Sequence, residues 1–260
     1  MEPNQLFGKD TMNAPWGLAS RLKLVLLACS FFSATNPASN HKALGKEQPN
    51  GGNAEPLTGH DFHITGTNRD GAAVAGTGLV VHPCFVLTCR HVLSDMKEVD
   101  EQQTFQGQAY TVNNESVHAH PKVDVAVMRV NGPPLSPLKG AIFQAPVVAQ
   151  TVYTLGYPKL PGLREASVTM QQGAVTNQSV TSLNGDSLFL YSAVSRPGNS
   201  GGPVMSDDGY IAGLSIVDAT GQYQQNDAFS PHYAGIPAQV VVKAVADLDL
   251  GIQLPIENYE

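Results

Sequence analysis

Charged residues are scarce in this sequence of 260 residues: Asp, Glu, Lys and Arg make up only 14% of it, and the formal net charge is -7. It contains no long run of Lys and Arg. Because phosphate binding needs clustered cations, the charge argues against nucleic acid as the main partner, and we expect none. With 25 Gly and 18 Pro beside so few charges, the composition disfavours a helical bundle and favours a turn-rich, sheet-rich protein.

Cysteine is rare as well, with only three residues in the chain. Cys84 and Cys89 stand five apart in what looks like one extended segment, which would separate them by about 16 Å and place them on opposite faces of a strand. A disulfide needs α-carbons within about 7 Å. We therefore expect no bridge between them, and a stability that rests on the core.

Hydrophobic runs long enough to span a bilayer are missing. The apolar run in "RLKLVLLACSFFSA" follows two cations and resembles the short central region of a signal peptide. We predict an export signal over residues 1–34. "LLAC", ending at Cys29, resembles the lipobox of bacterial lipoproteins, in which the cysteine is lipidated; the alternative is an export signal in which Cys29 is only a small apolar residue. The expected location is the periplasm or cell envelope, as a lipoprotein, or outside the cell.

The rest of the chain divides into a polar segment and a longer part with a regular apolar pattern. Residues 35–58 are polar and lack apolar periodicity, which predicts a flexible linker. Further on, short runs rich in Val, Thr, Ile and Tyr alternate with Gly, Pro, Asn and Asp about every eight to twelve residues, which indicates an all-β sandwich or barrel. The Pro-rich stretch "NGPPLSPLKG" divides it into β-rich halves, about 59–135 and 141–237. One helix is predicted at about 238–249, with a tail at 251–260.

The stretch "GNSGG" around Ser200 fits two unrelated hydrolase signatures. One is the G-x-S-x-G turn of α/β-hydrolases, where an acid and then a histidine follow the serine along the chain. Asp218 or Asp227 with His232 would complete that order. The helix that should follow the serine is missing, however, because Ser200 is followed by glycine, proline and a strand-like run.

The other order is histidine, aspartate, serine, and it fits better. His91 stands at the end of the apolar run in "VLTCRHVL", and Asp124 opens the apolar run in "DVAVMRV". A serine hydroxyl is a weak nucleophile unless a base takes its proton and a carboxylate orients that base. Asp95 and Asp100 lie in a polar run and are less suitable for that role than Asp124.

In this order the chain resembles the trypsin/chymotrypsin-like serine proteases, especially the bacterial HtrA (Deg) branch. The matching stretches are "GTGLVV", "VLTCRHV", "DVAVMRV", "VYTLGYP", "PGNSGGPV" and "YAGIPAQVV". The resemblance implies an all-β, chymotrypsin-like fold over residues 59–250: two antiparallel six-stranded barrels with the active site in the cleft between them, and a C-terminal helix. The HtrA branch usually carries a PDZ domain after the protease; since the chain ends at Glu260, we expect none.

The resemblance also implies the roles of the site residues. Ser200 would attack the scissile carbonyl, His91 would act as base and acid, and Asp124 would orient the imidazole, with the N–H groups of Gly198 and Ser200 as the oxyanion hole. The predicted function is a serine endopeptidase that acts through an acyl-enzyme on protein or peptide substrates, without metal or cofactor. The alternatives are a non-catalytic binding module on the same fold and an esterase. The sequence gives no signal for an oligomeric state.

Specificity residues follow from the same resemblance. Val194 would form the pocket base, with Ser195 adjacent to it and Ser215 in the strand that pairs with substrate. An apolar base favours a small or aliphatic residue before the scissile bond. His232 is a candidate for lining the pocket and recognising an acidic side chain; the alternative is a packed or solvated histidine.

Several residues depart from the family pattern or need a separate interpretation. Asn199 replaces the aspartate that pairs with a new N-terminus in trypsin-like zymogens, so we expect no activation of that kind. Cys89 and Arg90 replace two alanines; we interpret Cys89 as a buried apolar residue, with a redox-sensitive thiol as the alternative, and expect Arg90 to face solvent or pair with an acid. His118 and His120 are expected to be a solvated pair rather than a metal site.

Overall fold

The computed structural model describes residues 57–138, 141–216 and 233–258. The predicted export signal with Cys29, and almost all of the predicted linker, lie outside these residues. Within them, no helix has both the length and the apolar character needed to cross a membrane.

The first sheet holds six antiparallel strands. Its order is β4 (Glu98–Val99), β1 (Asp61–Thr67), β2 (Ala73–His82), β3 (Phe85–Thr88), β8 (Ala126–Arg129) and β7 (Val117–Ala119). A separate hairpin is formed by β5 (Gln102–Phe105) and β6 (Gln108–Thr111), and single 3₁₀ turns lie at Leu57–His60 and Asn114–Ser116. Phe62 of β1 stacks on Phe105 of β5 with ring centroids 5.4 Å apart, which joins the hairpin to the sheet.

The second sheet holds eight strands. Its order is β13 (Pro203–Ser206), β10 (Thr151–Gly156), β11 (Thr169–Thr181), β12 (Ser187–Tyr191), β15 (Tyr233–Pro237), β14 (Ile211–Ile216), β9 (Phe143–Gln144) and β16 (Ile256–Glu257). A further pairing between β13 and β14 closes six antiparallel strands into a barrel. The two extra strands, β9 and β16, are short and join β14 through parallel pairs. The chymotrypsin-like, all-β prediction is confirmed.

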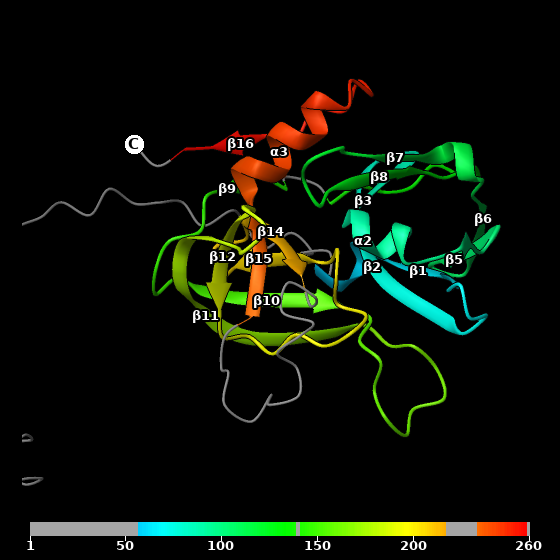
Figure 1. Ribbon diagram of the computed structural model, residues 1–260, viewed down its shortest axis with the longest axis horizontal. Helices are drawn as coiled ribbons and strands as arrows, with labels where there is room; N and C mark the ends of the chain where they lie inside the picture. The colour runs from blue at the N-terminus through cyan, green and yellow to red at the C-terminus, as the bar shows by residue number, and fades with distance from the viewer. Residues whose placement is uncertain (1–56, 139–140, 217–232, 259–260) are drawn as a thin grey trace, which may run out of the picture. The chain divides into compact units, whose positions relative to one another are not determined.

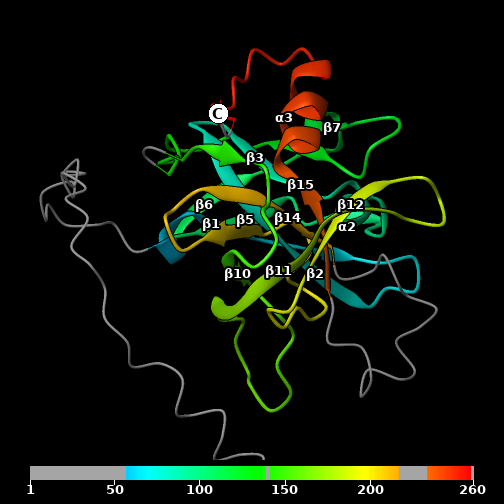
Figure 2. The same cartoon turned by 90° about the vertical axis from the view of Figure 1, so that its left-hand side faces the viewer.

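The predicted C-terminal helix is present as α3 (Ala238–Asp247). Pro237 occupies its N-cap position, where a missing N–H costs nothing. Its apolar face buries Val241, Ala244 and Val245 beside β14, β15 and β9. Figures 1 and 2 show α3 at the edge of the second barrel, close to β7 of the first sheet.

Both sheets contribute side chains to one continuous core. Phe62, Leu87 and Met128 come from the first sheet, and Leu155 and Leu214 from the second. The short helix α2 (Arg90–Ser94) directly follows the buried strand β3 and lies where the sheets meet (Figure 1). The shared core therefore holds the two sheets against each other, and His91, Asp124 and Ser200 lie on α2 and on the turns beside this junction.

Candidate active site

His91 is the second residue of α2. The apolar strand β3 ends at Thr88, and Cys89 occupies the N-cap position of α2 in an extended conformation. This turn from strand to helix brings the imidazole out of the core at the junction of the sheets. Asp124 lies just before β8, which pairs with β3, so the two side chains come from neighbouring strands.

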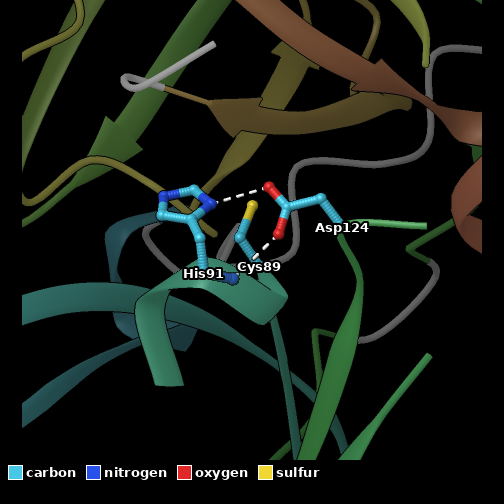
Figure 3. Close-up of side chains that lie close together, drawn as sticks. All are labelled: Cys89, His91 and Asp124. Carbon is cyan, nitrogen blue, oxygen red and sulfur yellow. Dashed lines mark hydrogen bonds and ion pairs between the residues drawn. The ribbon is translucent and has the colours of Figure 1, made fainter. Parts of the chain in front are cut away.

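The carboxylate of Asp124 contacts His91 at two points (Figure 3). Oδ2 lies 2.6 Å from the ring Nδ1, and Oδ1 accepts a hydrogen bond of 2.8 Å from the His91 backbone N–H. Each of the two side chains is only 22% exposed. Because a carboxylate can only accept, Nδ1 carries the proton, and Nε2 is the unprotonated ring nitrogen.

The side chains of His120 and Arg90 stabilise the turn before Asp124 through hydrogen bonds to its backbone. The Nδ1 atom of His120 accepts the backbone N–H groups of Lys122 and Val123 at 3.2 and 2.9 Å. The guanidinium of Arg90 donates from Nη1 to the carbonyl oxygens of His120 and Pro121, both at 3.1 Å. Arg90 therefore joins the His91 segment to the Asp124 segment.

Two expectations need correction at this turn. Arg90 pairs with no acid among the described residues; its partly exposed guanidinium donates to backbone carbonyl oxygens. His120 is not solvated, since it is 7% exposed, and its Nε2 lies 3.7 Å from Asp247 Oδ2 at the end of α3. In both cases no pattern in the sequence indicated that the side chain would form hydrogen bonds to the backbone of a turn.

Ser200 lies in a tight turn that enters β13. Its carbonyl oxygen accepts the Thr77 N–H at 2.9 Å, and the Gly201 N–H donates to the Ser215 carbonyl at 3.0 Å. A β-carbon on Gly201 would lie 2.9 Å from the backbone nitrogen of Cys89, two residues before His91. The turn that carries Ser200 is therefore packed directly against the segment that carries the imidazole.

The peptide between Pro197 and Gly198 has a defined orientation. The Pro197 carbonyl accepts the Lys159 N–H at 2.9 Å. In a trans peptide the following N–H points the opposite way, so the Gly198 N–H is directed away from the Lys159 loop. Gly198 has a φ of 102°, and a β-carbon there would lie 2.3 Å from the Tyr157 carbonyl oxygen. Only glycine fits this position.

Asn199 is 1% exposed and belongs to the same turn. Its Oδ1 accepts the Arg196 N–H at 3.1 Å, and its own N–H donates to the Arg196 carbonyl at 2.9 Å. The side-chain oxygen and the backbone N–H of Asn199 thus stabilise the turn through neutral local hydrogen bonds, and no charged partner lies among the described residues.

The Cys89 side chain lies between those of His91 and Asp124 in the view of Figure 3. It is 0% exposed, and its thiol donates to the Ser215 carbonyl at 3.4 Å. Burial, and next the charge of Asp124, raise the pKa of this thiol well above its usual value. The ligand atoms of Cys89, His91 and Asp124 lie within 4.8 Å of one another, but Nδ1 carries the proton that it shares with Oδ2 and so has no lone pair for a metal, and the raised pKa keeps the thiol protonated.

The predicted specificity residues have different surroundings. Val194 is 37% exposed, whereas Ser195 and Ser215 are buried. The hydroxyls of both serines lie 2.9 Å from the Tyr191 hydroxyl and 3.2 Å from each other. Burial raises the pKa of Tyr191 to about 12, so the phenol stays neutral. His232 lies outside the described residues.

A cavity of about 400 Å³ adjoins the His91–Asp124 pair. The first-sheet side of the lining includes Arg90 and Lys122, and the second-sheet side includes Leu188, Ile216 and Ile236. The cavity therefore opens beside His91 and Asp124, whereas Ser200 is not among its lining residues. The sequence did not identify Thr77, Tyr157 and Tyr191 as residues that contact the predicted site residues. The stretch "GTGLVV" does contain Thr77, between two glycines.

Comparisons with known proteins agree with this architecture. The sequence model of the trypsin-like peptidase domain matches residues 76–214. Proteins named "Probable periplasmic serine endoprotease DegP-like" from Chlamydia pneumoniae and Chlamydia trachomatis are each 29% identical over 157 residues, which is 58% of this chain. The match spans 30% of the length of these relatives.

Solved structures show the same fold. The active form of the Rv3671c protease from M. tuberculosis superimposes with a TM-score of 0.57 at 21% identity, covering 86% of this chain and 97% of that one. The serine endoprotease from Yersinia pestis gives a TM-score of 0.53 at 18% identity, covering 74% and 63% of the two chains.

Proposed function

Because the chain belongs to the trypsin-like peptidase domain family, we propose that it is a serine endopeptidase of the HtrA type that hydrolyses peptide bonds in proteins or peptides. The observation that carries this proposal is the bidentate contact between Asp124 and His91, with the Ser200 turn packed against the same segment. The pair holds the imidazole in the tautomer in which Nε2 is unprotonated and can act as a base.

In the proposed reaction, the Ser200 hydroxyl attacks the scissile carbonyl while its proton passes to His91. The imidazolium, stabilised by Asp124, then protonates the leaving amine and leaves an acyl-enzyme. Water hydrolyses this ester by the same proton transfers in reverse. The N–H groups of Gly198 and Ser200 would bind the oxyanion of each tetrahedral intermediate, and losing one such donor costs roughly a hundred- to a thousand-fold in rate.

For substrate preference, we propose a small or aliphatic residue before the scissile bond. Val194 supports this, since it is partly exposed and its side chain carries no charge. The hydroxyls of Tyr191, Ser195 and Ser215 are buried, neutral and hydrogen-bonded to one another, so they offer no charge that would favour a basic or acidic substrate side chain. A peptide-library cleavage profile measures this preference directly; cleavage after Arg or Lys, or after acidic residues, contradicts it.

We also propose that the chain is exported and acts in the periplasm, at the cell envelope or outside the cell. The apolar run after Arg21 and Lys23 supports export, as do curated relatives whose names call them periplasmic. Lipidation at Cys29 is the finer hypothesis. Labelling with a radioactive or alkyne fatty acid, lost in Cys29→Ser, tests it.

The catalytic proposal is tested by a fluorophosphonate probe and by casein cleavage. Wild-type protein and a Ser179→Ala control, which changes an exposed serine of β11, should both be labelled and cleave casein. Ser200→Ala should do neither. Casein hydrolysis separates a protease from an esterase, and an unlabelled wild-type protein, under conditions where a known serine protease reacts, would indicate a non-catalytic binding module.

A further inference from the structure

Thr77 connects the first sheet to the turn that carries the proposed nucleophile. It lies in β2 and is fully buried. Its backbone N–H donates to the Ser200 carbonyl at 2.9 Å, and its hydroxyl donates to the Gly198 carbonyl at 2.6 Å. One residue thus binds the carbonyl oxygens of both residues whose N–H groups would form the oxyanion hole.

The hydroxyl hydrogen of Thr77 has only one direction open to it. Oγ1 also lies 2.9 Å from the backbone nitrogen of Tyr157. An N–H can only donate, so Oγ1 accepts there and must direct its own hydrogen to the Gly198 carbonyl. On its other side, the Thr77 carbonyl accepts the hydroxyl of Thr88, the last residue of β3, at 2.7 Å. All polar atoms of Thr77 therefore have partners.

Glycines at the end of β10 and in the turn before β13 allow this close approach. A β-carbon on Gly156 would lie 2.7 Å from Thr77 Oγ1, and one on Gly202 would lie 3.0 Å from its Cγ2. A β-carbon on Gly201 would lie 2.3 Å from the Thr77 carbonyl oxygen. Side chains at these positions would push Thr77 away from the turn, so the contacts depend on the glycines around Ser200 as well as on the threonine.

We propose that Thr77 is a positioning residue for the oxyanion hole, an inference that rests on the proposed function. The Lys159 N–H fixes the peptide plane before Gly198, and the Thr77 hydroxyl fixes the plane after it. Gly198 has backbone freedom that other residues lack, so its N–H keeps one direction only while both planes are held. Without the hydroxyl, the Gly198 carbonyl and the Tyr157 N–H lose their partner in a buried site.

The kinetic consequence is specific. The oxyanion forms only in the transition state, so a misdirected Gly198 N–H lowers kcat and leaves KM nearly unchanged. Thr77→Val keeps the shape of the side chain and removes the hydroxyl, whereas Thr77→Ser keeps the hydroxyl. We expect kcat to fall about 10- to 100-fold in Thr77→Val, less than the loss of a whole oxyanion donor. Thr77→Ser should stay within about threefold of wild type.

A transition-state analogue gives a second measurement that a purely structural role would not change. A peptide aldehyde forms a tetrahedral adduct whose oxygen occupies the oxyanion hole, so its inhibition constant should weaken in Thr77→Val by the same factor as kcat. Rates are normalised to active sites titrated to completion with a fluorophosphonate, which removes any unfolded fraction from the comparison. Thr77→Ala, a second hydroxyl-free variant, should behave as Thr77→Val does.

Thr65→Val is the matched control, because Thr65 lies in β1 and its hydroxyl binds Asp100 at 2.6 Å, away from the Ser200 turn. It should lower thermal stability without changing kcat. If wild-type protein is active and Thr77→Val retains wild-type kcat and aldehyde affinity, the positioning role is wrong while the proposed function stands. If wild-type protein neither reacts with the fluorophosphonate nor cleaves casein, the proposed function itself fails.

Discussion

Asp124 holds both the ring and the backbone of His91, with Oδ2 2.6 Å from Nδ1 and Oδ1 2.8 Å from the backbone nitrogen. One carboxylate thus sets the tautomer of the imidazole and also fixes the first turn of α2 on which the imidazole stands. Orientation of the base and placement of its helix are coupled through a single side chain.

The first prediction concerns Asp124→Asn. An amide accepts only through its oxygen, so it cannot accept from both the backbone N–H and Nδ1 of His91. If its NH₂ group faces Nδ1, the ring carries its proton on Nε2 instead, which is the wrong tautomer for a base. We expect kcat for peptide hydrolysis to fall by about 10⁴-fold while the protein stays folded. Asp95→Asn, at an exposed aspartate after α2, is the control and should keep full activity. Comparable losses in both variants would contradict the assignment of Asp124.

The second prediction concerns Arg90. Its guanidinium spans the carbonyl oxygens of His120 and Pro121, which a lysine ammonium cannot reproduce with the same geometry. In Arg90→Lys and Arg90→Ala we expect the turn before Asp124 to loosen and kcat to fall about threefold to tenfold, from the loss of roughly 1 kcal/mol of hydrogen bonding. Arg129→Ala, at an exposed residue of β8, should leave kcat unchanged. Unaltered kcat in both Arg90 variants would show that this contact is dispensable for the reaction.

The third prediction concerns pH and Asp61. Burial raises the pKa of this carboxyl from 3.8 to about 8, and its two oxygens have no hydrogen-bond partner among the described residues. The folded state therefore holds a proton that the unfolded state releases above about pH 4, so stability falls as the pH rises from about 4 to 8.

Asp61→Asn cannot ionise and should remove this dependence. Urea unfolding at pH 8 should show the variant more stable than wild type by about 3–5 kcal/mol, with a much smaller difference near pH 4. Asp70→Asn, at an exposed aspartate, should follow the wild-type curve at every pH. Parallel curves for wild type and Asp61→Asn would mean that Asp61 is charged and has a partner in the folded protein.

The fourth prediction concerns Cys84 and Cys89, the two cysteines among the described residues. Cys89 is fully buried with a raised pKa, whereas Cys84 is partly exposed. In a Cys29→Ser background, Ellman's reagent should react promptly with one thiol and with the second only after unfolding. Adding Cys84→Ser should abolish the prompt reaction. Fast modification of Cys89 with loss of activity would instead support a redox-sensitive thiol beside the site.

Alternating hydrophobicity and turn residues were enough to predict the β-fold, because these features act locally along each strand. The same is true of α3, whose apolar residues recur at helical spacing before Gly251. The order of His91, Asp124 and Ser200 was also visible in the sequence, since His91 ends an apolar run, Asp124 opens one and Ser200 stands in a glycine-rich turn. A strand end followed by a turn carries its own local signature.

The contacts that orient these residues depend on segments far apart in the chain. Arg90 meets the turn at His120, and the Thr77 hydroxyl meets the Gly198 carbonyl 121 residues away, because the two sheets share a core. A hydroxyl and an uncharged carbonyl have no sequence pattern that marks them as partners. The sequence by itself therefore determined the fold and the set of candidate catalytic groups. Only tertiary packing decided which backbone planes are fixed, since that depends on how closely the glycine-lined turn approaches the first sheet.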